Sequence, residues 1–175
     1  MNELILTYRG IIYPWQCDHM GHMNVMWYTG KFDEASWQLL ARFGLTRTYM
    51  REQSGLLAAV QQDTAYKKEL RPGDIVTIRS SVLKIREKVI HFFHEMRNDE
   101  TGEIAAVTTL TGVHLDRKTR RASPFPADFI NRVRQTVSDR ERAYANDLHD
   151  TLPQDSFPND LHISLNPWDS AARST

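Results

Sequence analysis

A ten-residue segment near the start of the chain gathers side chains that can do chemistry. It reads Trp15-Gln16-Cys17-Asp18-His19-Met20-Gly21-His22-Met23-Asn24 and holds a carboxylate, two imidazoles, a thiol and an amide. An amphipathic helix is predicted directly behind it, and a helix start presents unpaired N–H groups and the positive end of the helix dipole. A carboxylate beside such donors suits a reaction in which a carbonyl oxygen becomes negative.

Three residues of this segment, Asp18, His22 and Gly21, have more than one plausible role. Asp18 can be a nucleophile or a general base toward water, or it can only shape a turn. His22 can orient a substrate, shuttle a proton or hold the loop by hydrogen bonds. Gly21 permits a backbone angle that other residues resist, or lets a substrate approach closely, and Asn24 is predicted to cap the helix.

The same segment also offers groups for two other chemistries. Cys17, Asp18, His19 and His22 resemble metal ligands, but structural zinc sites usually carry paired cysteines or widely spaced histidine pairs. We therefore predict no metal. A nucleophilic Cys17 would need a neighbour that lowers the pKa of its thiol, and a cysteine beside a strand end is more often simply packed.

Basic residues cluster in two places, between Lys67 and Arg71 and between Arg117 and Arg121. Such runs are ordinarily solvated turns, but they can also form a rim that binds phosphates, because Arg and Lys make charge-assisted hydrogen bonds to them. The candidates for phosphate contacts are Lys67, Arg71, Arg117 and Arg120. A formal net charge of zero favours a local patch of this kind over a nucleic-acid-binding face.

The elements that must position these residues follow from the hydrophobic pattern. Leu4 to Trp15 is predicted as a strand, and the helix extends from the Asn24 cap to about Phe43, with Gly44 beyond its end. The residues predicted for the apolar face of this helix are Tyr28, Phe32, Ala35, Leu39 and Phe43, widened by Met26, Trp37 and Leu40.

Four strands joined by short turns are predicted after the helix. They cover Leu56 to Leu70, Ile75 to Ile85, Val89 to Arg97 and Glu103 to Leu115. One long helix followed by strands in succession indicates an antiparallel α+β sheet, not alternating βαβ units. A short helix from Ala127 to Val137 follows, which divides the chain into a domain of residues 1–137 and a polar, proline-containing tail of residues 138–175.

The composition of the 175-residue chain sets further limits. The size suits one domain with a real core. A single Cys excludes an internal disulfide and fits a reducing compartment. The N-terminus lacks a signal-peptide pattern, and no apolar run is long enough to span a membrane. We therefore expect a cytoplasmic protein that uses neither a membrane nor a nucleic acid.

The chain resembles a known family. Asp18-x-x-Gly21-His22-x-Asn24, followed by Tyr28-x-x-x-Phe32-x-Glu34-Ala35 and the later Arg71-Pro72-Gly73-Asp74 turn, is similar to the hotdog-fold acyl-CoA thioesterases, in particular the 4-hydroxybenzoyl-CoA thioesterase-like branch. The resemblance covers about residues 4–137. Unlike the first member of that branch, this chain has His19 rather than Pro directly after the Asp, and it carries a His-x-Asn element that the member lacks. Its loop is thus closer to the broader acyl-CoA thioesterase group.

The resemblance implies a fold, an assembly and a site. The fold is an antiparallel β-sheet wrapped around one long central helix, and two subunits form a homodimer, often with continuous sheets, that can pair into a homotetramer. The site lies between subunits. Asp18 matches the catalytic carboxylate, and the backbone N–H of Val25 polarises the thioester carbonyl. His22 and Asn24 match motif positions whose roles vary, and Gly21 and Tyr28 are expected beside the substrate.

The expected activity is hydrolysis of an acyl-CoA thioester to the free acid and CoA. Asp18 acts as nucleophile or base, the helix start acts as oxyanion hole, and no cofactor is needed, since coenzyme A is part of the substrate. Two alternatives stay open. One is a non-catalytic hotdog protein that binds acyl thioesters, and the other is a metal-dependent hydrolase that uses Cys17, His19 and His22.

Overall fold

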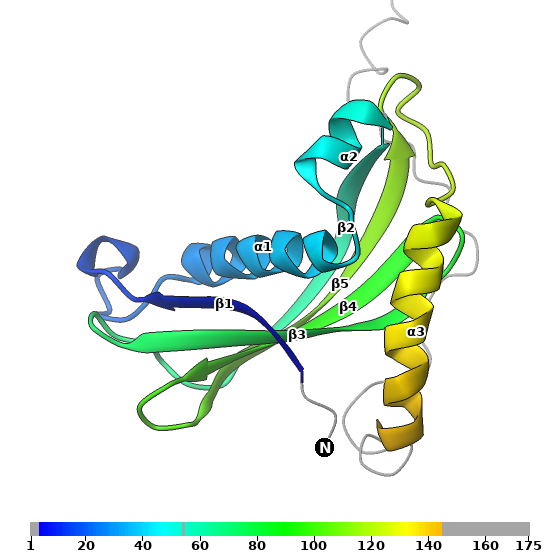
Figure 1. Cartoon of the computed structure of the whole chain (residues 1–175). Helices are drawn as coiled ribbons and strands as arrows, with labels where there is room; N and C mark the ends of the chain where they lie inside the picture. Colours follow the sequence, from blue (N-terminus) through cyan, green and yellow to red (C-terminus); the bar gives the residue numbers. More distant parts are fainter. Residues whose placement is uncertain (1–3, 54, 145–175) are drawn as a thin grey trace, which may run out of the picture.

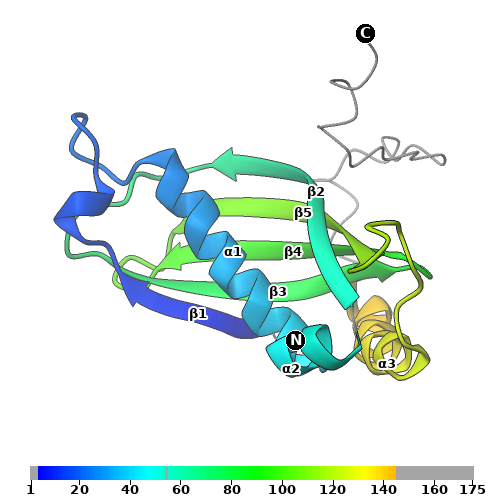
Figure 2. The ribbon, with the colours of Figure 1, turned by 90° about the horizontal axis from the view of Figure 1, so that it is seen from above.

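The computed structural model describes residues 4–53 and 55–144. The elements in chain order are β1 (Ile5–Ile11), the 3-10 turn η1 (Pro14–Gln16), α1 (Val25–Arg42), α2 (Arg47–Glu52), β2 (Gly55–Tyr66), β3 (Ile75–Ile85), β4 (Val89–Asn98), β5 (Ile104–Asp116) and α3 (Ala127–Tyr144). The five strands form one antiparallel sheet in the order β1-β3-β4-β5-β2. Helix α1 lies across one face of the curved sheet (Figures 1 and 2). The predicted hotdog fold is confirmed.

Helix α1 begins where its sequence predicts. The Asn24 side chain accepts a hydrogen bond from the Met26 N–H, which satisfies one of the free donors of the first turn. Gly44, with φ of +92°, follows the end of the helix, as expected for a residue that adopts the left-handed conformation at low cost.

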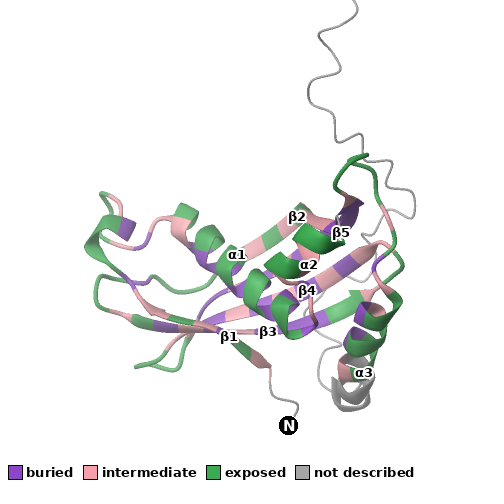
Figure 3. Cartoon of the chain, turned by 45° about the horizontal axis from the view of Figure 1, so that its top comes forward, coloured by how far each residue is buried: buried purple, intermediate pink, exposed green. Residues whose placement is uncertain are grey.

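The buried side of α1 is narrower than the sequence predicts. Its buried residues, spaced three or four apart, are Tyr28, Lys31, Phe32, Ala35, Ser36, Leu39 and Leu40. Met26 and Trp37, which were predicted to widen this face, are exposed by 64% and 39%. Figure 3 shows the outer side of the helix exposed, with buried positions on the strands beneath it. One helix on one sheet face buries a single stripe, so those two side chains remain in solvent.

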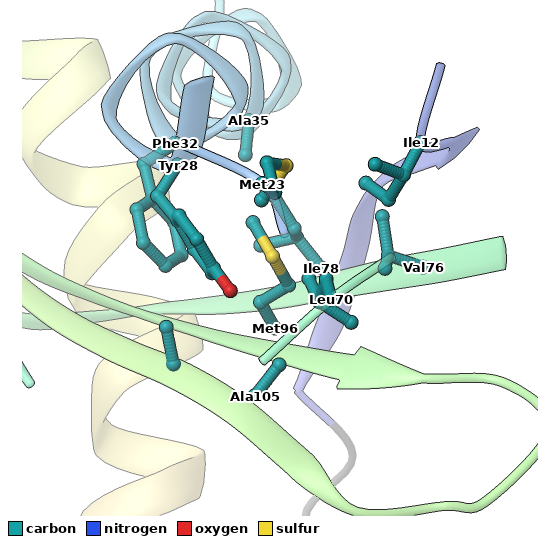
Figure 4. Packing of buried hydrophobic residues seen from close by; sticks show 11 residues of the cluster. Ile12, Met23, Tyr28, Phe32, Ala35, Leu70, Val76, Ile78, Met96 and Ala105 are labelled. Carbon is teal, nitrogen blue, oxygen red and sulfur yellow. The ribbon is translucent and has the colours of Figure 1, made fainter. Parts of the chain in front are cut away.

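The core lies between α1 and the sheet (Figure 4). Phe32, whose side chain is fully buried, lies with Tyr28 in one cluster that includes Ile78 and Met96 from the strands. A second cluster continues toward the end of α1 and includes Phe129 of α3. Truncation of a buried aromatic residue costs about 3–5 kcal/mol, so this packing fixes α1, and with it the loop ahead of α1, relative to the sheet.

A chain of hydrogen bonds also joins α1 to the sheet through a buried histidine. Ser36 Oγ donates to the Phe32 carbonyl at 2.8 Å, so it accepts from His94 Nε2 at 3.0 Å. His94 Nδ1 then accepts from the Ser80 hydroxyl at 2.5 Å, and the Ser80 oxygen lies 2.6 Å from Thr7 Oγ1. Both ring nitrogens of the neutral His94 imidazole therefore have hydrogen-bond partners, although the side chain is fully buried.

Two strands end earlier than predicted. β1 stops at Ile11, and the segment after it turns at Pro14, whose ring supplies no N–H for a ladder. β2 stops at Tyr66 instead of Leu70. The N–H groups of Lys67 and Lys68 both point to the Ala105 carbonyl, at 2.8 and 3.1 Å, so the regular pairing breaks there.

Two helices differ from the sequence prediction. The six-residue α2 was not predicted, because a single turn and a half is too short to show a helical period. Helix α3 continues past Val137 to Tyr144. Its last turns contain two Arg, one Glu and one Ala, which favour helices without an apolar pattern. The rest of the predicted tail lies outside the described residues. Among residues 4–53 and 55–144, no helix combines the length and apolar character required to cross a membrane.

The buried histidine predicts how stability depends on pH. Burial lowers the pKa of His94 from 6.5 to about 3. As the pH falls below 6.5, His94 therefore takes up a proton in the unfolded chain but stays neutral in the folded chain. Because the unfolded state binds more protons, the free energy of unfolding should fall as the pH drops from 6.5 toward 3. Burial lowers the pKa of His91 and His114 as well, so the wild-type slope is a sum of contributions.

Urea denaturation at pH 7 and pH 5 tests this with two variants. His94→Phe should be less stable than wild type at pH 7, since Ser36 and Ser80 lose a partner, but it should lose less further stability at pH 5. Ser80→Ala keeps the imidazole buried and should retain the wild-type pH slope. An unchanged slope in His94→Phe would contradict the assignment.

Candidate active site

The segment from Cys17 to Met23 forms a tight loop. Its two ends pair as an isolated antiparallel bridge, and the Asp18 N–H donates to the His22 carbonyl at 3.1 Å. Gly21 donates its N–H to the Asp18 carbonyl at 3.0 Å and has φ of +82°, a conformation that a residue with a Cβ rarely adopts. The expected conformational role of Gly21 is therefore present in the loop.

The Asp18 carboxylate is held by two hydrogen bonds. Oδ1 accepts from the Met20 N–H at 2.9 Å, and Oδ2 accepts from Asn24 Nδ2 at 3.1 Å. The Met20 N–H, the Asn24 amide and the nearby His22 and His19 hold the pKa of Asp18 below its usual value. Asp18 is thus an oriented anion at neutral pH.

Asn24 also shapes the start of α1. Its Oδ1 accepts from the Met26 N–H at 3.0 Å, and its backbone carbonyl accepts from the Trp27 N–H at 2.9 Å. Within the described residues, the Val25 N–H makes no hydrogen bond. One side chain therefore joins the carboxylate to the helix start, next to the free Val25 N–H that the family resemblance implies as a carbonyl donor.

A pocket of about 210 Å³ adjoins this helix start. It is lined by His22, Met23, Val25, Tyr28, Tyr66, Lys67, Lys68 and Glu69. Asp18 lies outside this lining and is connected to it through Asn24. The rings of Tyr28 and Tyr66 meet edge to face with centroids 5.1 Å apart. Burial raises the pKa of Tyr28 to about 12, and its hydroxyl donates to the Lys68 carbonyl at 3.2 Å.

Two pocket residues were missed by the sequence reasoning. Tyr66 is at the end of β2 and Glu69 is in the irregular segment after it, and each reaches the site only because β2 runs back toward the start of α1. Glu69 Oε1 lies 3.8 Å from His22 Nε2. Neither residue stands in a local pattern that signals a site, so no sequence signal was available to find them.

A second pocket, of about 480 Å³, shares Lys67, Lys68 and Glu69 with the first and extends to Arg71. Lys68 pairs with Glu103 at 2.9 Å, and Arg71 lies 3.7 Å from Glu69. Lys67 has no ion pair within the described residues. Two of the four cations predicted to contact phosphates, Lys67 and Arg71, are therefore next to the helix-start pocket.

The other two predicted cations, Arg117 and Arg120, lie elsewhere. They follow the last residue of β5, Asp116, which pairs with Gly55 at the start of β2. The site instead adjoins Tyr66 at the other end of β2, which pairs with Ala106. Within one chain they are therefore at the opposite end of the sheet from Asp18.

The geometry gives little support to the two alternative chemistries, a nucleophilic Cys17 and a metal site. Burial, followed by the neighbouring Asp18 charge, raises the pKa of Cys17, which disfavours a thiolate nucleophile. Among residues 4–53 and 55–144, no three His, Cys, Asp or Glu side chains are grouped to hold a metal ion.

A family model described as the Thioesterase-like superfamily matches residues 12–133. The chain therefore belongs to this superfamily, and the predicted class, a thioester hydrolase, is confirmed.

The chain is similar to particular relatives of that class. It is 25% identical over 144 residues to a betainyl-CoA thioesterase of Pseudomonas aeruginosa, an alignment that covers 82% of this chain and 89% of the relative. A Staphylococcus aureus protein solved in complex with CoA superposes with a TM-score of 0.73 at 19% identity over 90% of this chain and 92% of the other. A 1,4-dihydroxy-2-naphthoyl-CoA thioesterase from Synechocystis superposes with a TM-score of 0.65 at 16% identity over 77% and 96%.

Asn24 provides a test of how the site is held together. Asn24→Ala should lower the free energy of unfolding by about 1 kcal/mol through loss of the cap, and it should raise the pKa of Asp18 by removing a hydrogen bond. Asn24→Asp keeps an oxygen for the cap but places a second carboxylate beside Asp18, so it should raise that pKa further at a smaller cost in stability.

NMR titration of the Asp18 carboxyl carbon, together with urea denaturation, measures both quantities. The matched control is Thr46→Ala, which removes the Thr46 cap from the Tyr49 N–H of α2 and should leave the pKa of Asp18 unchanged. An equal pKa of Asp18 in wild type and Asn24→Asp would refute the proposed link.

Proposed function

We propose that the protein hydrolyses acyl-CoA thioesters, with Asp18 as nucleophile or general base and the Val25 N–H as an oxyanion donor. The observation that carries this is the double role of Asn24, which holds Asp18 and caps the helix whose first N–H is free. A carboxylate and a directed N–H donor are thereby brought within one local unit.

The proposed chemistry uses the charge that develops on the thioester carbonyl. The carbonyl oxygen of the thioester accepts a hydrogen bond from the Val25 N–H at the positive end of α1. The negative charge that develops on this oxygen when the carbonyl carbon is attacked is thereby stabilised. The Asp18 carboxylate, ionised at neutral pH, either attacks that carbon or removes a proton from an attacking water. In the first route CoA leaves as the thiolate, which takes a proton from solvent, and water then hydrolyses the mixed anhydride. In the second route the proton that Asp18 takes from water is passed to the departing sulfur.

The remaining site residues have proposed places along the substrate. Gly21 permits close approach to the loop, and His22 supports the reacting groups from the pocket wall. The acyl group lies against Tyr28 and the neighbouring Tyr66 ring. Because a relative is a betainyl-CoA thioesterase, and aromatic rings attract quaternary ammonium groups, betainyl-CoA belongs in the first assay panel.

Coenzyme A is proposed to extend from the helix start toward Lys67 and Arg71, where the second pocket offers cations to its phosphates. We further propose a homodimer in which β2 edges of two copies pair. β2 is an edge strand of twelve residues, and a long edge of this kind is ordinarily covered in a native protein. No metal and no separate cofactor takes part in the proposed reaction.

Replacement of the carboxylate is the first test. Asp18→Asn should lower the rate of thiol release from acyl-CoA substrates by about 10²–10⁴-fold, because the amide can neither attack nor accept the proton. Affinity for CoA itself should persist. The control is Asp33→Asn, which makes the same replacement at an exposed aspartate of α1 and should leave turnover unchanged. Near-normal turnover in Asp18→Asn would overturn the assignment.

The oxyanion donor can be removed by a proline. Val25 is the first residue of α1, where a helix tolerates proline. The preceding Asn24 has φ of −68° and ψ of 144°, which is the extended conformation that proline requires of its predecessor. Val25→Pro should therefore fold normally yet lose about 10²–10³-fold in kcat.

Val25→Ala, which keeps the N–H, is the matched control and should retain most of the activity. Thermal denaturation of both variants monitors the fold. If Val25→Pro were stable and as active as Val25→Ala, the Val25 N–H would have no part in catalysis.

The alternatives predict different results in the same assays. A non-catalytic binder would retain acyl-CoA without releasing free thiol. A metal-dependent hydrolase using Cys17, His19 and His22 would contain stoichiometric metal by elemental analysis and would lose activity with a chelator.

A further inference from the structure

The pocket beside the start of α1 has a limited size. Its volume of about 210 Å³ holds about seven groups as large as a water molecule, each of which occupies about 30 Å³. The carbonyl group and the sulfur of a thioester fill part of this space when the carbonyl oxygen reaches the Val25 N–H. The space that is left suits an acyl group of about four or five carbons.

The ring of Tyr66 forms the wall of this pocket toward β2. Tyr66 is the last residue of β2, is 48% exposed, and meets the edge of the Tyr28 ring. Tyr28 is buried between α1 and the sheet (Figure 4), and its hydroxyl donates to the Lys68 carbonyl, so its ring is held in place. An acyl chain that lengthens along β2 must therefore pass the Tyr66 ring.

The surface of β2 beyond Tyr66 is polar. Thr108 alternates along β5 with the core residue Leu110 and is itself buried, so it faces the side of the sheet that α1 covers. Thr64 Oγ1 lies 2.9 Å from Thr108 Oγ1, so Thr64 is on the same side. Residues two apart in a strand share a face, which places Gln62 and Thr64 in one row with Tyr66. We call Gln62 and Thr64 the polar row.

The polar row is poorly suited to bind a hydrocarbon chain. The Thr108 hydroxyl donates to the Asp63 carbonyl at 2.9 Å, so it accepts from the Thr64 hydroxyl. Gln62 Nε2 donates to Thr64 Oγ1 at 3.4 Å, and among residues 4–53 and 55–144 no donor reaches the amide oxygen of Gln62. An alkyl chain laid over this row would displace water from the Gln62 amide without replacing its hydrogen bonds, which is unfavourable.

We propose that the Asp18 site selects a short acyl group and that Tyr66 is the residue that sets its length. The polar row makes the surface beyond Tyr66 unfavourable for a longer alkyl chain. This rests on the proposed function, because the pocket is the acyl site when the thioester carbonyl lies at the Val25 N–H. The substrate class is then short-chain acyl-CoA rather than fatty acyl-CoA.

A series of straight-chain substrates tests the length limit. Burial of one methylene group favours binding about fourfold. For the wild type, kcat/KM should rise by about that factor per methylene from acetyl-CoA to butyryl-CoA and should stop rising by hexanoyl-CoA. A fatty-acyl site would instead continue the rise through octanoyl-CoA and dodecanoyl-CoA, and that result would overturn the proposal.

The Tyr66 ring can be removed or kept in matched variants. Tyr66→Ala should raise the ratio of kcat/KM for octanoyl-CoA to that for butyryl-CoA about tenfold, since more of the chain can be buried against Tyr28. Tyr66→Phe keeps the ring and should keep the wild-type ratio. The control is Tyr13→Ala, which removes a 44% exposed ring that stacks on Trp15 outside the pocket lining. An unchanged ratio in Tyr66→Ala would refute the role of Tyr66.

A change in the polar row separates its effect from that of the ring. Thr64→Val alone should leave the ratio unchanged, because the Tyr66 ring still ends the pocket. In the Tyr66→Ala background, Thr64→Val should raise the ratio a further threefold or so, since the chain then meets a methyl group instead of a hydroxyl. If Thr64→Val alone raised the ratio as far as Tyr66→Ala does, the ring would not set the limit.

Calorimetric titration with S-alkyl-CoA thioethers separates failure of this inference from failure of the proposed function. These compounds have no thioester, so binding is measured without turnover. Wild-type affinity should be no higher for S-octyl-CoA than for S-hexyl-CoA, and Tyr66→Ala should bind S-octyl-CoA about tenfold more tightly. This result would uphold the length limit even if no acyl-CoA were hydrolysed. An affinity of the wild type that rises about fourfold per methylene through S-octyl-CoA would overturn the inference and leave the hydrolase intact.

Discussion

The hydrogen bonds of the Asn24 side chain are the constraint on which the candidate site depends. The amide nitrogen donates to the Asp18 carboxylate, and the amide oxygen accepts from the first turn of α1. An aspartate in a loop would otherwise be free to turn into solvent. Because both bonds come from one short side chain, the direction of the carboxylate and the start of the helix are set together.

The position of that unit depends in turn on how α1 is held against the sheet. Phe32 and Ala35 pack into the core, and Ser36 joins the buried His94 network. Apolar burial fixes the distance of the helix from the sheet, while the hydrogen bonds favour one rotational setting of its buried side. A helix that slid or rotated would carry the Val25 N–H away from the pocket formed with β2. The same contacts thus stabilise the fold and place the site.

The sequence predicted much of this from local features. The N-cap at Asn24, the glycine after α1 and the bounds of β3 agree with the structure, since each depends on residues a few positions apart. The end of β2 could not be predicted in the same way. The strand stops where two N–H groups converge on Ala105, a partner far along the chain. Likewise, the hydrogen bonds of His94 to Ser36 and Ser80 join three separate elements and leave no sequence pattern.

By itself the sequence determined the local chemistry: an aspartate, a glycine turn and a capped helix start in one continuous segment, whose geometry is set by short-range hydrogen bonds. The tertiary structure decided which distant residues share that site. It brought Tyr66 and Glu69 beside Val25 and His22, and it placed Arg117 and Arg120 at the far end of the sheet. Strand order and register alone determine which distant residues become neighbours. That order and register arise when one helix is buried against one sheet, and spacing along the chain does not reveal them.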